Sequence, residues 1–420
     1  MRVCVVLEHR FSQTVDGAVW TDGQFPRSFW LRYLDVFDEV RVVARVKPVP
    51  SALPGWRRAD RDGVVFTRVP YYVGPRQYLL KAGAVRRAVR EGVGDGDAVI
   101  LRVSSQLSSI LFPTLERAGH PYAVEVVADP YNVFAPGAVR HPLRPLFRWR
   151  FTRSLRRQCA GACAAAYVTA GALQRRYPPR PGAFATHYSS VELPSQAVAE
   201  RPRPAGNGDG RPRTLVMVGT LAQLYKAPDV LIDAVARCLE QGLDLRLLFV
   251  GNGKHRGELQ ARAARHGLNG RVGFLGQLSS GEAVRDVLDQ ADVFVLPSRQ
   301  EGLPRAMIEA MARGLPCIGS TIGGIPELLP PEDMVPPGDV EALAGKIQEV
   351  GSDPQRMART SARNLQKVKE YREDVLTARR GEFYRYVRKQ TEAWLNTKKP
   401  RVDRPVPDAI ACQAKMRVNP

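Results

Sequence analysis

The feature that most constrains the fold is an alternation of short apolar runs with longer amphipathic stretches, which occurs twice along the chain. In the first half, apolar runs lie at 3–7, 40–46, 64–69, 98–103 and 122–127. Helix-like stretches separate several of them, for example 28–37 and 78–91. Such an alternation predicts a parallel sheet that is covered by helices.

The pattern breaks at 194–213, PSQAVAERPRPAGNGDGRPR, and then starts again. This segment is rich in Pro, Gly and Arg and has no apolar periodicity, so we interpret it as a linker. Strand-like runs follow it (RTLVMVG, LRLLFVGNG, RVGFLG, DVFVLPS and PCIGS), with helices predicted at 228–241 and 258–266. We therefore predict an α/β protein with two doubly wound, Rossmann-like domains facing across a cleft. Ligands of such sheets bind at the carboxyl ends of the strands.

The predicted domains follow from these changes of pattern. They are an N-terminal domain at 1–193, the linker at 194–213, a C-terminal domain at 214–370, a final helix at 371–397 and a basic, disordered tail at 398–420. We find no internal repeat.

Composition narrows the class of protein. The chain has 420 residues, of which 44% are apolar and 25% are charged, as in a soluble globular protein. No apolar run reaches the roughly 18 residues that a membrane helix needs. The start, MRVCVVLEHR, meets an acid and a His too early for a signal peptide, so a cytoplasmic location is expected. The six cysteines form no CxxC pair, and we expect reduced thiols and no metal site.

The net charge of +20 points to an anionic partner. Between Arg140 and Arg180 there are many arginines and no acid. Helical spacing in 143–157 places an apolar stripe beside basic residues, and the stripe consists of Leu143, Phe147, Phe151 and Leu155. One interpretation is a basic amphipathic helix on the anionic inner face of the cell membrane. The other, which we favour, is an ordinary helix that packs its stripe into the core.

The most informative stretch is DVFVLPSRQEGLPRAMIEAMARGLPCIGSTIGGIPEL, at 292–328. Pro304 suits the first turn of a helix, and Gly314 suits its C-terminal end. The start of that helix offers the positive end of its dipole and free backbone N–H groups. This is a ready site for a phosphate or a diphosphate, lined by Gly302, Leu303 and Arg305.

Two glutamates bracket this helix start. Glu301 lies just before it, and Glu309 lies five residues into the helix, about 7.5 Å along its axis. Their carboxylates could accept hydrogen bonds from sugar hydroxyls on opposite sides of one diphosphate. The alternative is a helix-start acid favoured by the dipole and an unrelated surface acid.

Loops after the neighbouring strands supply further candidates. Gly251 and Gly253 belong to a second strand–glycine–helix turn, GNGKHRGEL, and Gly323 and Gly324 form a third glycine turn. Lys226 follows the strand RTLVMVG, where an ammonium group can neutralise a diphosphate. Each signal is weak by itself, because a GxG is common and a lone Lys is usually solvated.

Together these motifs resemble the retaining glycosyltransferases of family 4, also called the group 1 glycosyltransferases, which have the GT-B fold. The resemblance rests on EGLPRAMIE, with seven residues between its glutamates, on AMARGLPCIGSTIGGIPEL after it, and on VGNG, RVGFLG and DVFVLPS before it. It is strong over 213–330, moderate in the final helices and weak in the N-terminal half. By this resemblance the final helices cross back to the first domain.

The resemblance implies a role for each matching residue. Glu301 would contact the transferred sugar, Glu309 the ribose of the nucleotide, and Lys226 the diphosphate. The backbone at Gly302, Leu303 and Pro304 would line the phosphate and sugar pocket, and the turn around Phe274 would hold the base.

The chain departs from the family at several positions. Gly219 is followed by Thr220 where the family has a phosphate-binding Arg, which leaves Gln223 or another Arg to compensate. Ala227 stands where Gly is usual after the Lys. The N-terminal Gly-rich loop has no GG pair, and its candidates are Asp22, Gly23 and, less strongly, Gly17.

Two N-terminal polar residues are further candidates. Asp129 lies near the place where many relatives have a catalytic His, and we count it either as a sugar contact or as the start of the DPYN turn. His9 follows the first strand and could face the cleft.

The implied function is transfer of a sugar from a UDP-, GDP- or dTDP-sugar to an acceptor hydroxyl, without a required cofactor or metal. The acceptor could be a saccharide, a lipid-linked saccharide or a small aminocyclitol-like molecule, in polysaccharide, glycolipid or antibiotic biosynthesis. One rival is a nucleotide-sugar epimerase or a phosphorylase of the same fold. A distant rival is a nucleic-acid-binding protein, but the chain has no recognition motif for nucleic acid.

Overall fold

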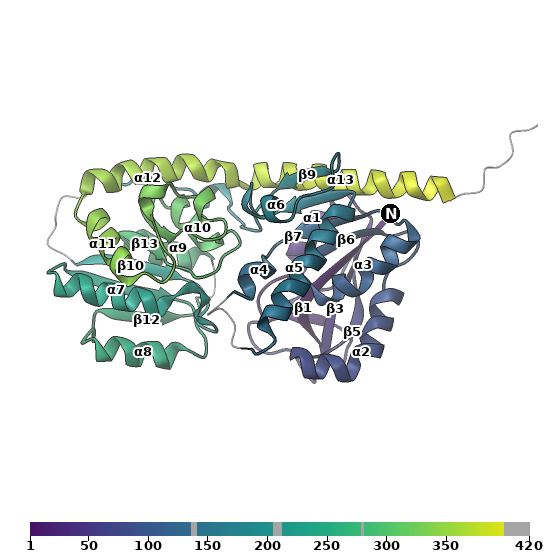
Figure 1. Ribbon diagram of the computed structural model, residues 1–420, viewed down its shortest axis with the longest axis horizontal. Coiled ribbons are helices and arrows are strands. Elements are labelled where there is room, and N and C mark those ends of the chain that lie inside the picture. Colours follow the sequence, from purple (N-terminus) through teal and green to yellow (C-terminus); the bar gives the residue numbers. More distant parts are fainter. Residues whose placement is uncertain (136–140, 205–211, 279–280, 399–420) are drawn as a thin grey trace, which may run out of the picture.

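The computed structural model describes residues 1–135, 141–204, 212–278 and 281–398. The tail predicted at 398–420 lies outside this part from residue 399 on, as does most of the Gly-rich half of the predicted linker. Within it, the chain forms two sheets with helices on both sides, joined end to end (Figure 1).

The N-terminal sheet has parallel strands in the order β5-β3-β1-β6-β7-β8-β9. Their bounds are β1 Arg2–Gln13, β3 Glu39–Pro48, β5 Val64–Pro70, β6 Ala98–Val103, β7 Tyr122–Val126, β8 Ala164–Tyr167 and β9 Phe184–His187. The strand β1 is longer than the apolar run at 3–7 predicts. Past a register shift after Val6, it continues beside β3 and pairs with the short antiparallel β2 (Val19–Thr21), which pairs in turn with β4 (Arg57–Arg58).

Helices follow the strands of this sheet as the alternation predicts. They are α1 Arg27–Leu34, α2 Gly74–Glu91, α3 Gln106–Ala118, α4 Pro130–Val133, α5 Arg144–Gly161 and α6 Ala172–Arg176. Two buried apolar clusters lie against the sheet, because parallel strands covered by helices bury both faces.

The C-terminal sheet is parallel throughout, in the order β12-β11-β10-β13-β14-β15. Its strands are β10 Arg213–Val218, β11 Leu245–Val250, β12 Val272–Gly276, β13 Val293–Leu296, β14 Cys317–Ser320 and β15 Met334–Val335. Its helices are α7 Pro228–Glu240, α8 Arg256–Arg265, α9 Gly281–Gln290, α10 Arg305–Ala312, α11 Val340–Gly351 and α12 Pro354–Val368. The strand order reverses between β10 and β13, which is where doubly wound sheets bind ligands.

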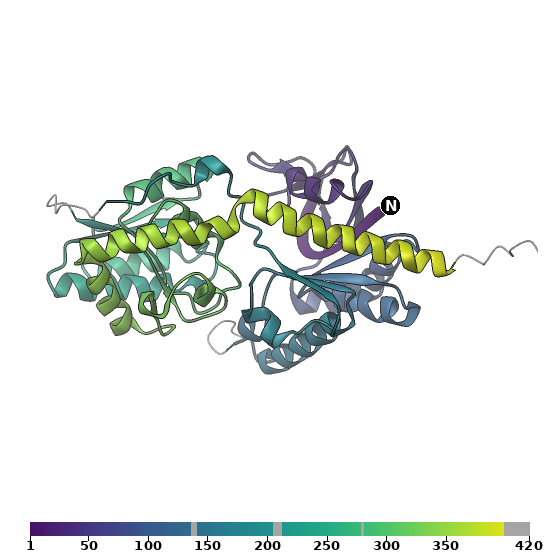
Figure 2. The ribbon, with the colours of Figure 1, turned by 90° about the horizontal axis from the view of Figure 1, so that it is seen from above.

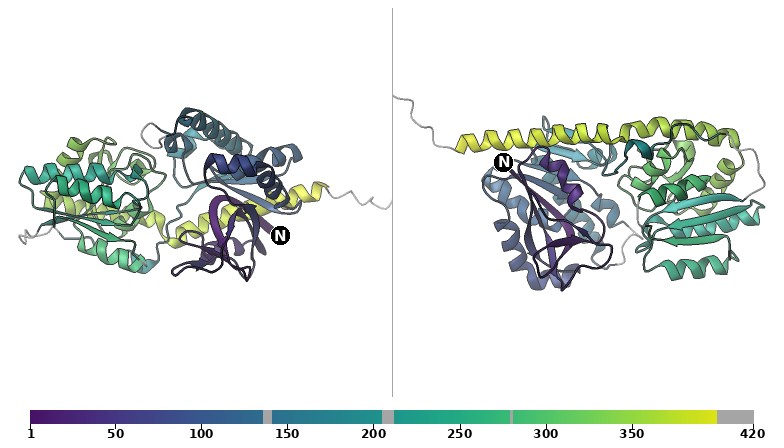
Figure 3. Two further views of the ribbon diagram at one scale, coloured as in Figure 1. Left: turned by 90° about the horizontal axis from the view of Figure 1, so that it is seen from below. Right: turned by 180° about the vertical axis from the view of Figure 1, so that it is seen from behind.

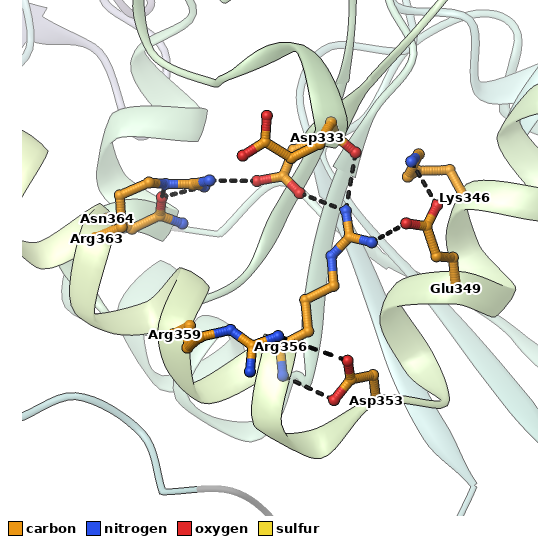
Figure 4. Close-up of polar contacts among 9 residues, drawn as sticks. Asp333, Lys346, Glu349, Asp353, Arg356, Arg359, Arg363 and Asn364 are labelled. Atoms are coloured by element: carbon orange, nitrogen blue, oxygen red, sulfur yellow. Dashed lines mark hydrogen bonds and ion pairs between the residues drawn. The ribbon is translucent and has the colours of Figure 1, made fainter.

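The helix α12 is held to this unit by a buried carboxylate (Figure 4). Asp333 is 1% exposed and forms ion pairs with Arg356 at 3.0 Å and with Arg363 at 2.6 Å. Both arginines lie on α12, so one charge fixes two of its turns.

The last helix, α13 (Glu373–Lys398), leaves the C-terminal unit and packs on the N-terminal one. Figures 1 and 2 show α12 and α13 as a nearly continuous rod along one side of the molecule, and Figure 3 shows the same rod from behind. Within this rod, α13 contacts β6, β7, β8, β9 and α1.

Glu125 on β7 anchors α13. This carboxylate is 2% exposed and accepts hydrogen bonds from the hydroxyl groups of Tyr33 at 3.0 Å, Tyr188 at 2.8 Å and Tyr384 at 3.1 Å. It also pairs with Arg102. Tyr384 lies on α13, so a buried charge of the N-terminal sheet is satisfied in part by the C-terminal helix.

We predict that Glu125→Ala lowers the free energy of unfolding by about 3–5 kcal/mol, because Arg102 would remain as a buried charge without its carboxylate. Urea denaturation followed by the fluorescence of the buried Trp30 measures this. The milder Tyr384→Phe should cost about 1 kcal/mol. The control, Glu392→Ala, removes an exposed pair with Arg388 on the same helix. It should cost no more than about 0.5 kcal/mol, and equal losses in all three variants would contradict the prediction.

Candidate active site

A cavity of about 750 Å³ lies between the two sheets, at the carboxyl ends of their strands. The N-terminal side contributes the middle of β1, the end of β6 and residues that follow β2, β6, β7, β8 and β9. The C-terminal side contributes the end of β10, the start of α10 and loops after β10, β12 and β13. We call it the transfer cleft. Its C-terminal lining is Val218, Gly219, Thr220, Tyr225, Lys226, Gln277, Glu301, Gly302, Leu303, Pro304, Arg305, Ala306 and Glu309.

The start of α10 faces this cleft. Pro304 is its extended N-cap, and the helix runs over Arg305–Ala312, close to the sequence prediction. The first N–H groups of a helix have no acceptor within it, so the tip presents donors and a positive dipole end to the cleft.

Backbone contacts fix this tip. The N–H of Gly324 donates to the carbonyl of Gly302 at 2.6 Å. Gly323 has a φ of +59°, and a Cβ there would overlap the carbonyl of Glu301. The glycine turn therefore packs directly beneath the loop that begins α10, where a larger residue has no room.

Glu301 and Lys226 form an ion pair in the wall of the cleft. The ammonium nitrogen of Lys226 lies 2.8 Å from Oε1 of Glu301, and both side chains are largely buried. The hydroxyl of Ser298 donates to the same oxygen at 2.9 Å. A cation and an acid are thus held together beside the helix tip.

Arg299 positions the loop that carries Lys226. It makes a two-point contact with Asp229, at 2.8 and 2.7 Å, and donates to the carbonyls of Leu224 and Tyr225. A Cβ at Gly219 would overlap the stem of Lys226, so the glycine leaves the path that this side chain takes into the cleft.

Ala227 shows why the family prefers glycine at that position. Its φ of 55° and ψ of 46° lie in the left-handed region, which costs a residue with a Cβ about 1–2 kcal/mol. This chain keeps the same turn with Ala.

The side chain of Arg305 adds a cation to the cleft, whereas the sequence prediction used only the backbone N–H of this residue. It is exposed, lines the cleft and stands at the first position of α10. Thr220, which stands where the family has an Arg after Gly219, also lines the cleft but carries no charge. Arg305 is therefore a candidate to supply the missing positive charge. Gln223 is not among the lining residues.

Glu309 lines the cleft five residues beyond Pro304. Burial raises the pKa of its carboxyl, and the nearby Arg305 and Arg285 act in the opposite direction. It is the second acid of the predicted bracket and, unlike Glu301, forms no ion pair with the described residues.

The other glycine loop shapes the cleft from behind. Gly251 and Gly253 do not line it, but they pack against the backbone of Gly219 and of Leu221. Phe274 stacks on Phe249 at 5.0 Å and does not line the cleft, whereas Gln277, just after its strand, does.

Asp129 is not brought to the transfer cleft. It caps α4, accepting from the N–H of Tyr131 at 3.0 Å and from the hydroxyl of Tyr177 at 2.5 Å, and it pairs with Arg176. The turn interpretation of DPYN describes this geometry. The candidates of the N-terminal loop also lie off the cleft, since Asp22, Gly23 and Gly17 do not line it and Gln24 and Phe25 do.

Several lining residues of the N-terminal side carried no sequence signal that we recognised. They are Glu8, Gln24, Phe25, Arg102, Ser104, Ser189 and Ser190. His9 lines the cleft as well, and burial lowers its pKa to about 4, so the ring is neutral at pH 7.

A contact between the two units lies beside the cleft. Glu327, in the short turn Ile325–Glu327, accepts hydrogen bonds from the N–H groups of Ala170, Gly171 and Ala172, at 2.5, 2.9 and 2.7 Å. These groups precede or begin α6, so the C-terminal unit caps a helix of the N-terminal unit.

The described residues contain no group of three or more His, Cys, Asp or Glu side chains that could hold a metal ion. In the same part of the chain, no helix combines the length and apolarity needed to cross a bilayer.

Residues 212–353 match the family described as "Glycosyl transferases group 1". This region belongs to the group 1 glycosyltransferases. The matched region contains α10, Lys226 and both glutamates of the motif.

Similar proteins agree with this assignment over more of the chain. "Protein CapJ" of Staphylococcus aureus is 25% identical over 77% of this chain and 80% of its own length. "2-deoxystreptamine glucosyltransferase" of Streptomyces kanamyceticus is 28% identical over 74% of this chain and 86% of its own length. The structure of Anabaena Alr3699/HepE in complex with UDP superposes with a TM-score of 0.60 at 16% identity, covering 94% of this chain and all of that one. The predicted GT-B fold is confirmed, and the glycosyltransferase is an enzyme that transfers a sugar.

The raised pKa of Glu309 predicts a pH-dependent effect on stability. The folded-state pKa lies above the unfolded value, so ionisation opposes folding. This cost is absent below the unfolded pKa, grows as the pH rises from the unfolded to the folded pKa, and is complete above the folded pKa. Glu309→Gln should therefore raise Tm near neutral pH, and the gain should shrink as the pH falls toward about 4. Differential scanning fluorimetry across pH measures this. The exposed Glu282→Gln serves as control, and a gain independent of pH would argue against buried ionisation as the cause.

Proposed function

We propose that this glycosyltransferase moves a sugar from a nucleoside diphosphate sugar to an acceptor hydroxyl with retention at the anomeric carbon. The observation that carries the proposal is the tip of α10, which lines the cleft between the sheets together with Glu309 and with the ion pair of Lys226 and Glu301. The proposal places the donor in the C-terminal unit and the acceptor in the N-terminal unit.

Each group has a task in this proposal. The N–H groups at the tip of α10 bind the diphosphate, as helix N-termini bind phosphates. Lys226 and Arg305 add positive charge beside it. Glu309 accepts hydrogen bonds from the ribose, and Glu301 accepts them from the hydroxyls of the transferred sugar.

In the reaction step, the bond between the anomeric carbon and the phosphate oxygen breaks, and the acceptor oxygen bonds to that carbon on the same face. The acceptor proton passes to the leaving phosphate oxygen. Charge develops on the diphosphate, where the α10 tip and Lys226 are already in place to stabilise it. The proposed step uses these protein groups and calls on no cofactor.

Lys226 must exchange partners in this scheme. Its ammonium pairs with Glu301 in the structure, and a bound diphosphate would compete for it. When Lys226 leaves Glu301, a carboxylate oxygen becomes available to a sugar hydroxyl. Binding of the diphosphate thus prepares the site for the transferred sugar.

UDP is the first nucleotide to test, because the structurally similar Alr3699/HepE was solved with it. We predict that UDP, GDP or dTDP raises Tm of the wild-type protein and that Glu309→Ala weakens binding of the effective nucleotide about tenfold. Glu301→Ala should lower kcat about 10²–10³-fold with a smaller loss of nucleotide affinity. Thermal shift and initial rates measure these effects, with Glu282→Ala as control.

The absence of stabilisation by any of the three nucleotides would count against the proposed donor site. Wild-type kinetics in both glutamate variants would refute the assigned roles. Mass spectrometry of the products separates transfer from the rival reactions of the same fold, because an epimerase joins no sugar to an acceptor and a phosphorylase consumes inorganic phosphate.

The arginine-rich α5 offers a surface for an anionic membrane. Its predicted apolar stripe is split, since Leu155 is buried and Phe147 and Phe151 pack against Phe134. A different set of apolar side chains is exposed at its start: Leu143 at 51%, Leu146 at 50% and Trp149 at 61%. We propose that this end, with the exposed Arg150 and Arg153, rests on the cytoplasmic face of the membrane.

Co-sedimentation with vesicles tests this contact. Wild-type protein should bind vesicles that contain phosphatidylglycerol and should be released by salt, whereas vesicles of phosphatidylcholine should bind little. A variant carrying Arg150→Glu and Arg153→Glu should lose most of the binding, and Arg68→Glu on β5 should retain it. Equal binding of both variants would remove the proposed surface.

A further inference from the structure

A second cavity, of about 800 Å³, opens beside the transfer cleft in the N-terminal unit. Glu8 and His9 line both, so the two spaces adjoin at the register shift in the middle of β1. Its size lies within the range of ligand-binding pockets. None of the C-terminal motifs that resemble the family contributes to it, whereas Asp22 of the N-terminal loop lines it.

Three cations gather on one face of the neighbouring strands β1 and β3. The register places Arg10 directly opposite Arg45 and Ser12 directly opposite Lys47, and all four line the cavity. Like charges opposite one another destabilise a sheet. A bound anion would offset this repulsion.

Arg10 and Lys47 have no carboxylate partner among the described residues, and both are exposed. Arg45 differs, because it is buried and pairs with Glu8 at 3.2 Å. Glu8 is itself engaged by the N–H groups of Gln106 and Leu107, which begin α3. The charge of Glu8 is therefore already balanced, and the positive charge of Arg10 and Lys47 is not.

Aromatic side chains complete the cavity. Trp20, Trp56 and Tyr71 line it and are half-buried, so part of each ring is available to a ligand. Trp20 on β2 stands opposite Ser12 on β1, and Ser12 stands opposite Lys47 on β3, so the three residues form one row across the sheet. Flat apolar rings next to polar groups suit the alternating C–H and hydroxyl surfaces of a sugar.

We infer that this cavity binds the acceptor and that the acceptor is a saccharide carrying an acidic group, a carboxylate or a phosphate, recognised by Arg10 and Lys47. The inference rests on the proposed function, since it names the substrate that meets the donor at the junction near His9. The single unbalanced carboxylate of the cavity, Asp22, lies two residues beyond Trp20 and is placed to accept hydrogen bonds from sugar hydroxyls. A cationic aminocyclitol would be repelled by the same two side chains.

Isothermal titration calorimetry with matched probes tests the inference. Trigalacturonate and its fully methyl-esterified form have the same sugar rings and differ only in the charge of their carboxyl groups. Glucose 6-phosphate is a sugar that carries a phosphate in place of a carboxylate. The aminocyclitol 2-deoxystreptamine carries positive charge and serves as the opposite case. We expect trigalacturonate or glucose 6-phosphate to bind at least about tenfold more tightly than the ester and 2-deoxystreptamine, and we expect the stronger of the two to identify the acidic group.

Variants locate the binding. The double variant Arg10→Gln, Lys47→Gln should weaken the acidic probe about tenfold or more and leave the ester unchanged. Arg68→Gln is the matched control, because Arg68 is an exposed cation of the same sheet that stands opposite Ala44, on the other face from Arg45 and Lys47. Trp56→Ala should weaken the acidic probe and the ester alike.

The inference would be overturned if the acidic probes and the ester bound with equal affinity, or if 2-deoxystreptamine bound more tightly than the acidic probes. It would also be overturned if Arg68→Gln weakened the acidic probe as much as the double variant does. Displacement of the acidic probe by UDP would place that probe in the donor site and would likewise overturn it. Failure of the proposed donor site shows differently. In that case the nucleotides would not raise Tm, while the acidic probe would still bind and still depend on Arg10 and Lys47.

Discussion

The constraint on which the site depends is the close approach of backbone to backbone at the carboxyl end of the C-terminal sheet. Gly323 and Gly324 lie against the carbonyls of Glu301 and Gly302, and Gly219 lies against the stem of Lys226. Because these contacts leave no space for a Cβ, they fix the height of the α10 tip and the direction of Lys226 together. The ion pair between Lys226 and Glu301 follows from that placement, since the two side chains leave loops that cannot move independently.

The two units are joined by polar contacts of different strength. Glu327 caps α6 from the opposite unit with exposed or half-buried groups, a contact that water can replace at modest cost. Glu125 is buried and binds three tyrosines and an arginine, one of the tyrosines on α13. The first contact is open to solvent, whereas the second lies at the core of the N-terminal unit, where breaking it would leave a buried charge unpaired.

Much of the fold followed from the sequence because parallel strands that are buried on both faces are continuous apolar runs. The same logic located α10, whose start and end carry Pro304 and Gly314. Strands as short as β2 and β4 have no such run, because each of their pairings, β2 with the second half of β1 and β4 with β2, joins only two residues of each strand. The candidate site was predictable where the backbone itself makes it, at Gly302 to Pro304, and where Lys226 and the two glutamates extend from it.

The N-terminal half of the site was harder to predict. Its groups come from strand ends that are far apart in the sequence, so their spacing carries no pattern. Asp129 illustrates the difficulty, because an Asp before Pro can equally cap a turn, and in the structure Tyr177 and Arg176 occupy its carboxylate. The cation row of β1 and β3 depends on strand register, which two isolated apolar runs do not define.

The course of α13 has a consequence for how the molecule can move. The chain passes from one unit to the other between β9 and Ala199, whose N–H donates to the carbonyl of Ala312 on α10. It returns between α12 and α13, so the units are connected twice. Two rigid units joined at two points rotate most easily about the axis through those points. Rotation about other axes and translation along the interface would strain one of the connections. The opening of this enzyme should therefore be a single swing, with the same face of each lobe meeting its counterpart at every turnover.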